Sequence, residues 1–132
     1  MEEIQRIEQV IKDSIGWAIT KDIEKLYSII ANDENLIIVN PDDSQVCGIT
    51  EFRKNADFWM DPRFEAVGFE VRNLAVKISE SGSVAWFSCR LDDLAMWEGK
   101  PCGWENVRWT GVLEKRKCIW TLVQMHFSYP KA

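Results

Sequence analysis

Apolar residues recur at helical spacing through the first half of the chain. They predict an amphipathic helix over residues 2–17, a second and shorter helix capped by Thr20, and a third from Thr50 to about Met60. Pro62 prevents the third helix from extending further. The apolar stripe of the first helix consists of Ile4, Ile7, Ile11, Ile15 and Ala18.

After Pro62 the pattern changes to the period of two that is typical of β-strands. Apolar residues hold the odd positions up to Val71 and then shift phase, so that Leu74 is the next of them. A slip of one residue predicts a β-bulge near Arg72 and Asn73, and therefore a strongly curved sheet. Further strands are expected over residues 84–96, 103–115 and 119–128.

The order of these elements predicts the fold class. Three helices, interrupted by a short hairpin over residues 36–47, precede a long antiparallel meander. Helices segregated from an antiparallel sheet form an α+β domain. A curved sheet wrapped around the helices would form a cone with a cavity at its mouth. The 132 residues suit a single domain, 1–132, without linkers or repeats.

The last strands carry an apolar face and a polar, aromatic face. Odd positions are apolar over residues 85–91, 107–113 and 119–127, so we expect the helices to cover that face. A three-residue loop over residues 116–118 would set the register of the last two strands. The cross-strand pairs would then be Arg108 with His126, Thr110 with Gln124, and Asn106 with Ser128.

Two interpretations of the polar face compete. In the first, the face lines a pocket, Arg90 and Arg108 hold an anionic or carbonyl group, and His126 exchanges a proton with the ligand. In the second, the face is the outside of the sheet and packs against a second subunit. The apolar face that the helices require favours the second. The polar face comprises Trp86, Ser88, Arg90, Asp92, Asn106, Arg108, Thr110, Glu114, Trp120, Gln124, His126 and Ser128.

Motifs for particular chemistries are lacking in the sequence. The single histidine, His126, has no Ser or Cys nucleophile at motif spacing. The sequence has two pairs of adjacent carboxylates, Asp42-Asp43 and Asp92-Asp93. The two side chains of each pair would point to opposite faces of a strand, so neither pair forms an acid/base dyad by itself. No glycine-rich phosphate loop occurs. The four cysteines show no CxxC spacing, so we expect reduced thiols and no metal site.

Charge and hydropathy limit the kinds of partner that the protein can have. The net charge is −5 and no basic stripe exists, which argues against nucleic acid. The charged N-terminal stretch has no signal-peptide core, and no apolar run reaches membrane-spanning length. We therefore expect a cytoplasmic protein that does not associate with membranes.

A motif in the last two strands consists of Arg108, Thr110, Val112, Trp120, His126 and Ser128. Together with the order of elements, it resembles the SnoaL-like branch of the nuclear transport factor 2-like superfamily. That branch is similar to the association domain of calcium/calmodulin-dependent protein kinase II and to ketosteroid isomerase-like proteins. The resemblance implies a cystatin-like conical barrel, with three N-terminal helices packed on a curved antiparallel sheet, usually homodimeric through the sheet.

The resemblance leaves several functions open, because proteins of this fold include isomerases, polyketide cyclases, dehydratases, epoxide hydrolases and association modules. We expect a small-molecule-binding domain with a cavity between sheet and helices, an unknown organic ligand and no cofactor. One alternative is a metal-free acid/base lyase or isomerase, similar to ketosteroid isomerase or polyketide cyclase. Another is a non-catalytic dimerisation or association module.

The sequence identifies no catalytic residue. Steroid isomerases combine an aspartate base with a tyrosine and a protonated aspartate, and that set cannot be placed with Tyr27 and Tyr129 as the tyrosines. The candidates for ligand binding are Tyr27, Trp59, Trp86, Arg90, Asp92, Arg108 and His126. The candidates for a dimer interface are Arg108, Thr110, Trp120, Gln124 and His126.

Overall fold

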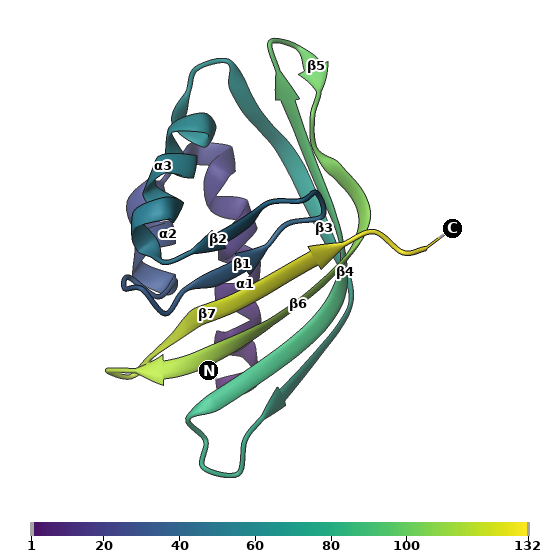
Figure 1. Ribbon diagram of the computed structural model, residues 1–132. Coiled ribbons are helices and arrows are strands. Elements are labelled where there is room, and N and C mark those ends of the chain that lie inside the picture. The colour runs from purple at the N-terminus through teal and green to yellow at the C-terminus, as the bar shows by residue number, and fades with distance from the viewer. Residues whose placement is uncertain (1, 132) are drawn as a thin grey trace.

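The computed structural model describes residues 2–131, and Figure 1 shows its helices gathered on one side of a curved sheet. The helices are α1 (Glu3–Thr20), α2 (Ile23–Ile29) and α3 (Ile49–Met60). The strands are β1 (Ile37–Val39), β2 (Gln45–Cys47), β3 (Phe64–Ile78), β4 (Val84–Trp97), β5 (Lys100–Pro101), β6 (Trp104–Arg116) and β7 (Ile119–Ser128). Within the described residues, no helix is both long enough and apolar enough to cross a membrane.

The sheet confirms the α+β class. Its strand order is β2-β1-β7-β6-β4-β3, and β5 pairs with β4. The pairing of β1 with β7 is parallel, whereas the other named pairs are antiparallel. The sheet is curved but remains open, with β2 and β3 at its edges, so it is not closed into the expected barrel.

Two helix starts differ from the predicted caps. Thr20 is the last residue of α1, and Asp22 caps α2 by accepting a hydrogen bond from the backbone N–H of Lys25. The backbone before α3 needs a φ of 88°, which Gly48 adopts without strain, so the helix begins two residues before the region that Thr50 would cap.

β-bulges bend the long strands. The register of β3 against β4 shifts between Arg72 and Ala75, and Asn73 has a φ of 55°, which confirms the predicted bulge. A second shift, between Ala66 and Gly68, was not predicted. A third lies in β6, where Asn106 has a φ of 56°.

The register of β6 against β7 differs from the prediction. The turn has two residues, Lys117 and Cys118, with φ values of 47° and 67°, instead of three. The shorter turn shifts the register by one residue, and an irregularity beyond Leu113 shifts it by one more. The observed pairs are Arg108 with Ser128, Thr110 with His126, and Val112 with Gln124.

Trp120 lies between the turn and the irregularity, where the shift is one residue, and it therefore faces the helices. It is 3% exposed, and its indole N–H donates to the Glu3 carboxylate at 2.7 Å. The expected place of Trp120 on the outer face, and with it a role at an interface there, is wrong. The polar residues of β7 beyond the irregularity remain on the outer face of the sheet. Two successive shifts of one residue restore the original alternation of the strand.

The core lies between the helices and the concave face of the sheet. Trp109 is fully buried at its centre, with its ring edge-on to Phe87 at 5.1 Å and stacked on Phe127 at 5.5 Å. Gly111 leaves space for this packing, because a Cβ at this position would lie 2.7 Å from the Phe87 ring and from the Gln124 carbonyl. These contacts fix the inner wall that carries the candidate site.

Replacing Gly111 by alanine should destabilise the protein by about 1–3 kcal/mol, because the added methyl group meets a backbone carbonyl as well as a ring. Urea denaturation measures the change. Gly68→Ala in β3 is the matched control, since a Cβ there meets nothing within 4 Å. Equal stability of the two variants would contradict this account of the core.

Candidate functional site

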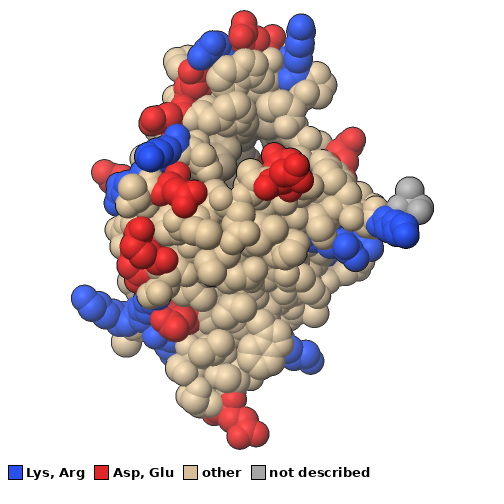
Figure 2. All heavy atoms as spheres, in the orientation of Figure 1, with Lys and Arg blue, Asp and Glu red and all other residues tan. Residues whose placement is uncertain are grey.

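A cavity of about 350 Å³ lies between the helices and the concave face of the sheet. Its walls are mainly aromatic and aliphatic. Among the aromatic residues, Trp17 comes from α1, Trp59 from α3, Trp104 from β6 and Phe127 from β7. Figure 2 shows the surface hollowed between the helices and the sheet, beside acidic side chains. The cavity therefore has an opening to solvent and an apolar interior.

Asp93 brings a carboxyl group into this apolar wall. Along β4, Leu91 is fully buried and Ala95 is 8% exposed, and the alternation of a strand places Asp93 on the same inner face. Burial raises the pKa of Asp93 from 3.8 to about 6, with no hydrogen bond or charged neighbour contributing to the shift. The group is therefore poised to gain or lose a proton near neutral pH.

The bulge in β6 shapes the cavity next to Asp93. Val107 pairs with Leu91, but Trp104 pairs with Asp93, so β6 has one more residue than β4 over this interval. The extra residue turns Trp104 inward, where its ring lies 5.0 Å from Phe127. Trp104, Phe127 and Asp93 therefore line the same cavity.

The other polar side chains of the lining are engaged elsewhere. Ser14 donates to a backbone carbonyl of α1 at 2.7 Å, and Asn40 donates to Ser44 at 2.9 Å. Asp42 accepts from the backbone N–H and the hydroxyl of Ser44, and these hydrogen bonds hold its pKa below the ordinary value. Burial, and then the charge of Asp93, raises the pKa of the Cys102 thiol.

Two of the predicted ligand-binding residues come from helices. Trp59 lines the cavity, with its ring 5.5 Å from Phe52 and 6.0 Å from Trp17. Tyr27 is not part of the lining: it packs edge-on against Phe52 at 6.2 Å, and the guanidinium group of Arg53 lies 4.6 Å from its ring centroid.

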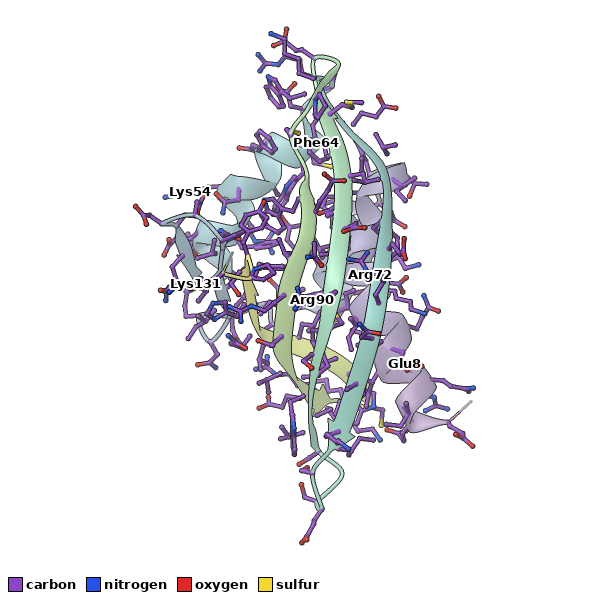
Figure 3. All side chains as sticks on the ribbon, turned by 90° about the vertical axis from the view of Figure 1, so that its right-hand side faces the viewer. Glu8, Lys54, Phe64, Arg72, Arg90 and Lys131 are labelled. Atoms are coloured by element: carbon purple, nitrogen blue, oxygen red, sulfur yellow. The ribbon has the colours of Figure 1, made fainter. Side chains whose placement is uncertain are left out.

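The remaining five predicted ligand-binding residues lie outside the cavity. Trp86, Arg90, Asp92, Arg108 and His126 belong to the outer face of the sheet, onto which Figure 3 looks with Arg72 and Arg90 labelled. The expectation that they converge on a ligand in the cavity is wrong. The physical reason is the alternation of the strands, which gives the inner face to the apolar rows.

The outer face carries a hydrogen-bonded network of its own. Arg72 binds Asp92 through two hydrogen bonds, of 2.6 and 3.3 Å, and the backbone N–H of Asn106 donates to the same carboxylate at 2.7 Å. Arg72 and Arg90 both donate to the Asn106 side chain, at 3.2 and 3.4 Å. The bulge at Asn106 is therefore fixed from the outer side.

Four of the predicted interface residues are found together on this outer face. Arg108, Thr110 and His126 are exposed, and Gln124 borders a shallow hollow that Trp86 also lines. Trp86 itself is 46% exposed, a large apolar surface for an isolated domain. The pairing of two copies through this face stays a prediction.

Asp93 is the site residue that sequence reasoning missed. The odd positions of β4 up to Leu91 were assigned to the inner face, and the same alternation continues to Asp93 and Ala95. The alternation that places Asp92 on the outer face places Asp93 on the inner one, so the pattern itself carried the signal. In the part of the chain that the structure describes, no group of three or more His, Cys, Asp or Glu side chains is placed to hold a metal ion.

Asp93 should make stability fall as the pH rises. The folded state keeps the proton up to about pH 6 and the unfolded chain only to about pH 3.8, so stability is lost between these values. Between about pH 4 and pH 8, the unfolding free energy of Asp93→Asn should therefore rise by about 2.5 kcal/mol relative to wild type.

Denaturation at several pH values measures this difference. Asp92→Asn is the control with the opposite sign, because the hydrogen bond from Arg72 lowers the pKa of Asp92 and its stabilisation is lost at low pH. Parallel pH profiles for wild type and Asp93→Asn would show that the carboxyl group is not buried as described.

Comparisons with known proteins agree with this architecture. The chain is similar to an NTF2-like protein from Cytophaga hutchinsonii, with 12% identity, a TM-score of 0.80, and coverage of 98% of this chain and 100% of that one. It is similar to a candidate dehydratase of the NTF2-like family from Streptomyces avermitilis, with 19% identity, a TM-score of 0.82, and coverage of 98% and 97%. A third is a candidate Ca/calmodulin-dependent kinase II association domain from Exiguobacterium sibiricum, with 9% identity, a TM-score of 0.79, and coverage of 100% and 96%.

At these identities the likeness shows the fold alone. No curated protein matches the sequence. The sequence model of the SnoaL-like domain family matches residues 7–132, which is nearly the whole chain. The chain therefore belongs to the SnoaL-like domain family.

Proposed function

We propose that this protein binds a small, largely apolar organic molecule in the cavity between the helices and the sheet. The observation that carries the proposal is the cavity itself, about 350 Å³ in volume and walled mainly by aromatic and aliphatic side chains. Binding pockets for small molecules typically have about 300–1,000 Å³ and a few polar groups in an apolar lining. Asp93 supplies such a polar group.

Filling the cavity should abolish binding. Ala18 lines the cavity from α1, and Ala18→Leu would extend its side chain into the space a ligand needs. The probe is 1-aminonaphthalene, a fluorophore that is uncharged at neutral pH and brightens in apolar surroundings. We expect wild type to bind it and Ala18→Leu to bind it at least about tenfold more weakly, a loss of about 1.4 kcal/mol.

The matched control is Ala75→Leu, at an exposed alanine on the outer face of β3. It adds the same atoms without entering the cavity and should leave the affinity unchanged. Equal weakening by both substitutions, or no enhancement of fluorescence by wild type, would contradict the proposed site.

A second function, metal-free acid/base catalysis, is favoured by one observation: Asp93 is a half-buried carboxyl group that lines the space for a ligand, and desolvation raises its pKa to about 6. A general acid or base works best when its pKa lies near the working pH, and it contributes about 100–10,000-fold to the rate. The candidate dehydratase among the similar structures is consistent with this chemistry but does not assign it. A lyase or isomerase acting on a neutral substrate would use Asp93 in this way.

A model reaction tests the base directly. 5-Nitrobenzisoxazole is a neutral aromatic compound whose isoxazole ring opens when a base removes the C–H proton of that ring: the N–O bond breaks and the product is a nitrile with a phenolate oxygen. Wild type should accelerate this opening with a rate that rises to a plateau above about pH 6, and Asp93→Asn should lose at least about 100-fold. Asp57→Asn, at an exposed position of α3 that does not line the cavity, should retain the rate. A wild-type rate no greater than that of Asp93→Asn would exclude Asp93 as a base.

A further inference from the structure

Building on the proposed ligand-binding function, we infer that the cavity selects small organic cations, namely amines whose ammonium group pairs with Asp93 while an aromatic or alicyclic body fills the aromatic walls. The inference names the charge class of the ligand. It is carried by the charges of the lining, by the unpaired state of Asp93 and by the rings around it.

The lining is acidic. Among residues 2–131, the charged side chains of the lining are Asp42 and Asp93, and no Lys, Arg or His belongs to it. The helices contribute Ser14 and apolar or aromatic side chains, and β7 contributes Met125 and Phe127. Cys102 is the further titratable group of the lining, and its raised pKa keeps it uncharged.

Within the described part of the chain, one cation–π contact involves a ring of the lining, and its cation is already hydrogen-bonded. The Lys21 ammonium group lies 6.0 Å from the Phe64 ring centroid. It donates a hydrogen bond of 2.8 Å to the backbone carbonyl of Asp61. Lys21 is therefore held away from Asp93, which has no charged neighbour contributing to its pKa.

Among the described residues, Asp93 has no partner that would form an ion pair with it. Above about pH 6 it carries a negative charge in a half-buried, largely apolar wall, and an unpaired charge that is partly withdrawn from water is costly. A bound ammonium group would compensate that charge, whereas a neutral ligand would displace water and leave the charge without a partner. A carboxylate ligand would place a second negative charge against the first.

The aromatic walls suit the same ligand class. Trp17 and Trp59 meet edge to face at 6.0 Å on the helix side, and Trp104 and Phe127 lie 5.0 Å apart on the sheet side. The faces of indole and phenyl rings attract cations, by about 0.5–2 kcal/mol per contact. Rings from both layers can therefore surround an ammonium group at Asp93.

Three probes of nearly equal size separate the charge classes: 2-phenylethylamine is a cation, 2-phenylethanol is neutral and 3-phenylpropionate is an anion. Titration calorimetry at about pH 7.5 should show the amine bound at least about tenfold more tightly than the alcohol, and the anion more weakly than either. At about pH 5 the advantage of the amine should shrink about tenfold, because Asp93 must first release its proton.

The variants assign the preference to a residue. Asp93→Asn should bind the amine and the alcohol within about threefold of each other, while Asp57→Asn, at an exposed carboxylate of α3 outside the lining, should keep the wild-type preference. An alcohol bound as tightly as the amine by wild type overturns the inference and leaves the ligand-binding function standing, as does an anion that binds best. Failure of all three probes overturns the inference, and failure of 1-aminonaphthalene as well overturns the proposed function.

Discussion

The cavity exists because the long strands bend, and they bend at β-bulges. A flat sheet of the length of β3, β4 and β6 would lie against the helices along its whole face and leave no space. The bulges at Asn73 and Asn106 put residues with positive φ into otherwise extended backbone, and each adds local twist. In the bent sheet, β3 and β7 contact α1, while Trp104 and Ala95 line the cavity that is left between sheet and helices.

The pleat of β4 then separates two neighbouring carboxyl groups into opposite environments. Asp92 points outward, where the guanidinium group of Arg72 and the backbone N–H of Asn106 lower its pKa. Asp93 points inward, where burial raises its pKa to about 6. The outer network also fixes the bulge that turns Trp104 toward Asp93, so the two faces are mechanically linked through Asn106.

The sequence predicted those features that repeat along a strand or helix and missed those that depend on a single backbone angle. The phase slip between Val71 and Leu74 predicted the bulge, because it inverted a long alternation of apolar and polar residues. The turn at Lys117 and Cys118 gave no such signal, since both residues have positive φ although neither is glycine or asparagine. The family resemblance supplied the fold, but it could not decide which face of the sheet meets the cavity.

The charged side chains of the polar face lie outside the cavity for a related reason, whereas Trp59 lines it. Clustered charges in a strand indicate the face where solvent and partner side chains satisfy them. A single acidic residue in an apolar row is the more informative pattern, because an unpaired charge in that position lowers stability unless something outside the chain compensates it. Asp93 is such a residue, and its alternation with Leu91 and Ala95 was visible in the sequence.

The two roles open to Asp93 make different demands on its pKa. An ammonium ligand stabilises the carboxylate and lowers its pKa, so the same complex would have a weaker base than the empty cavity. A neutral C–H acid leaves the pKa near its raised value and uses the proton affinity that burial creates. In both cases the ligand removes the energetic cost of the unpaired carboxylate. A cavity of this kind favours whatever molecule neutralises that one charge, by pairing with it or by giving it a proton.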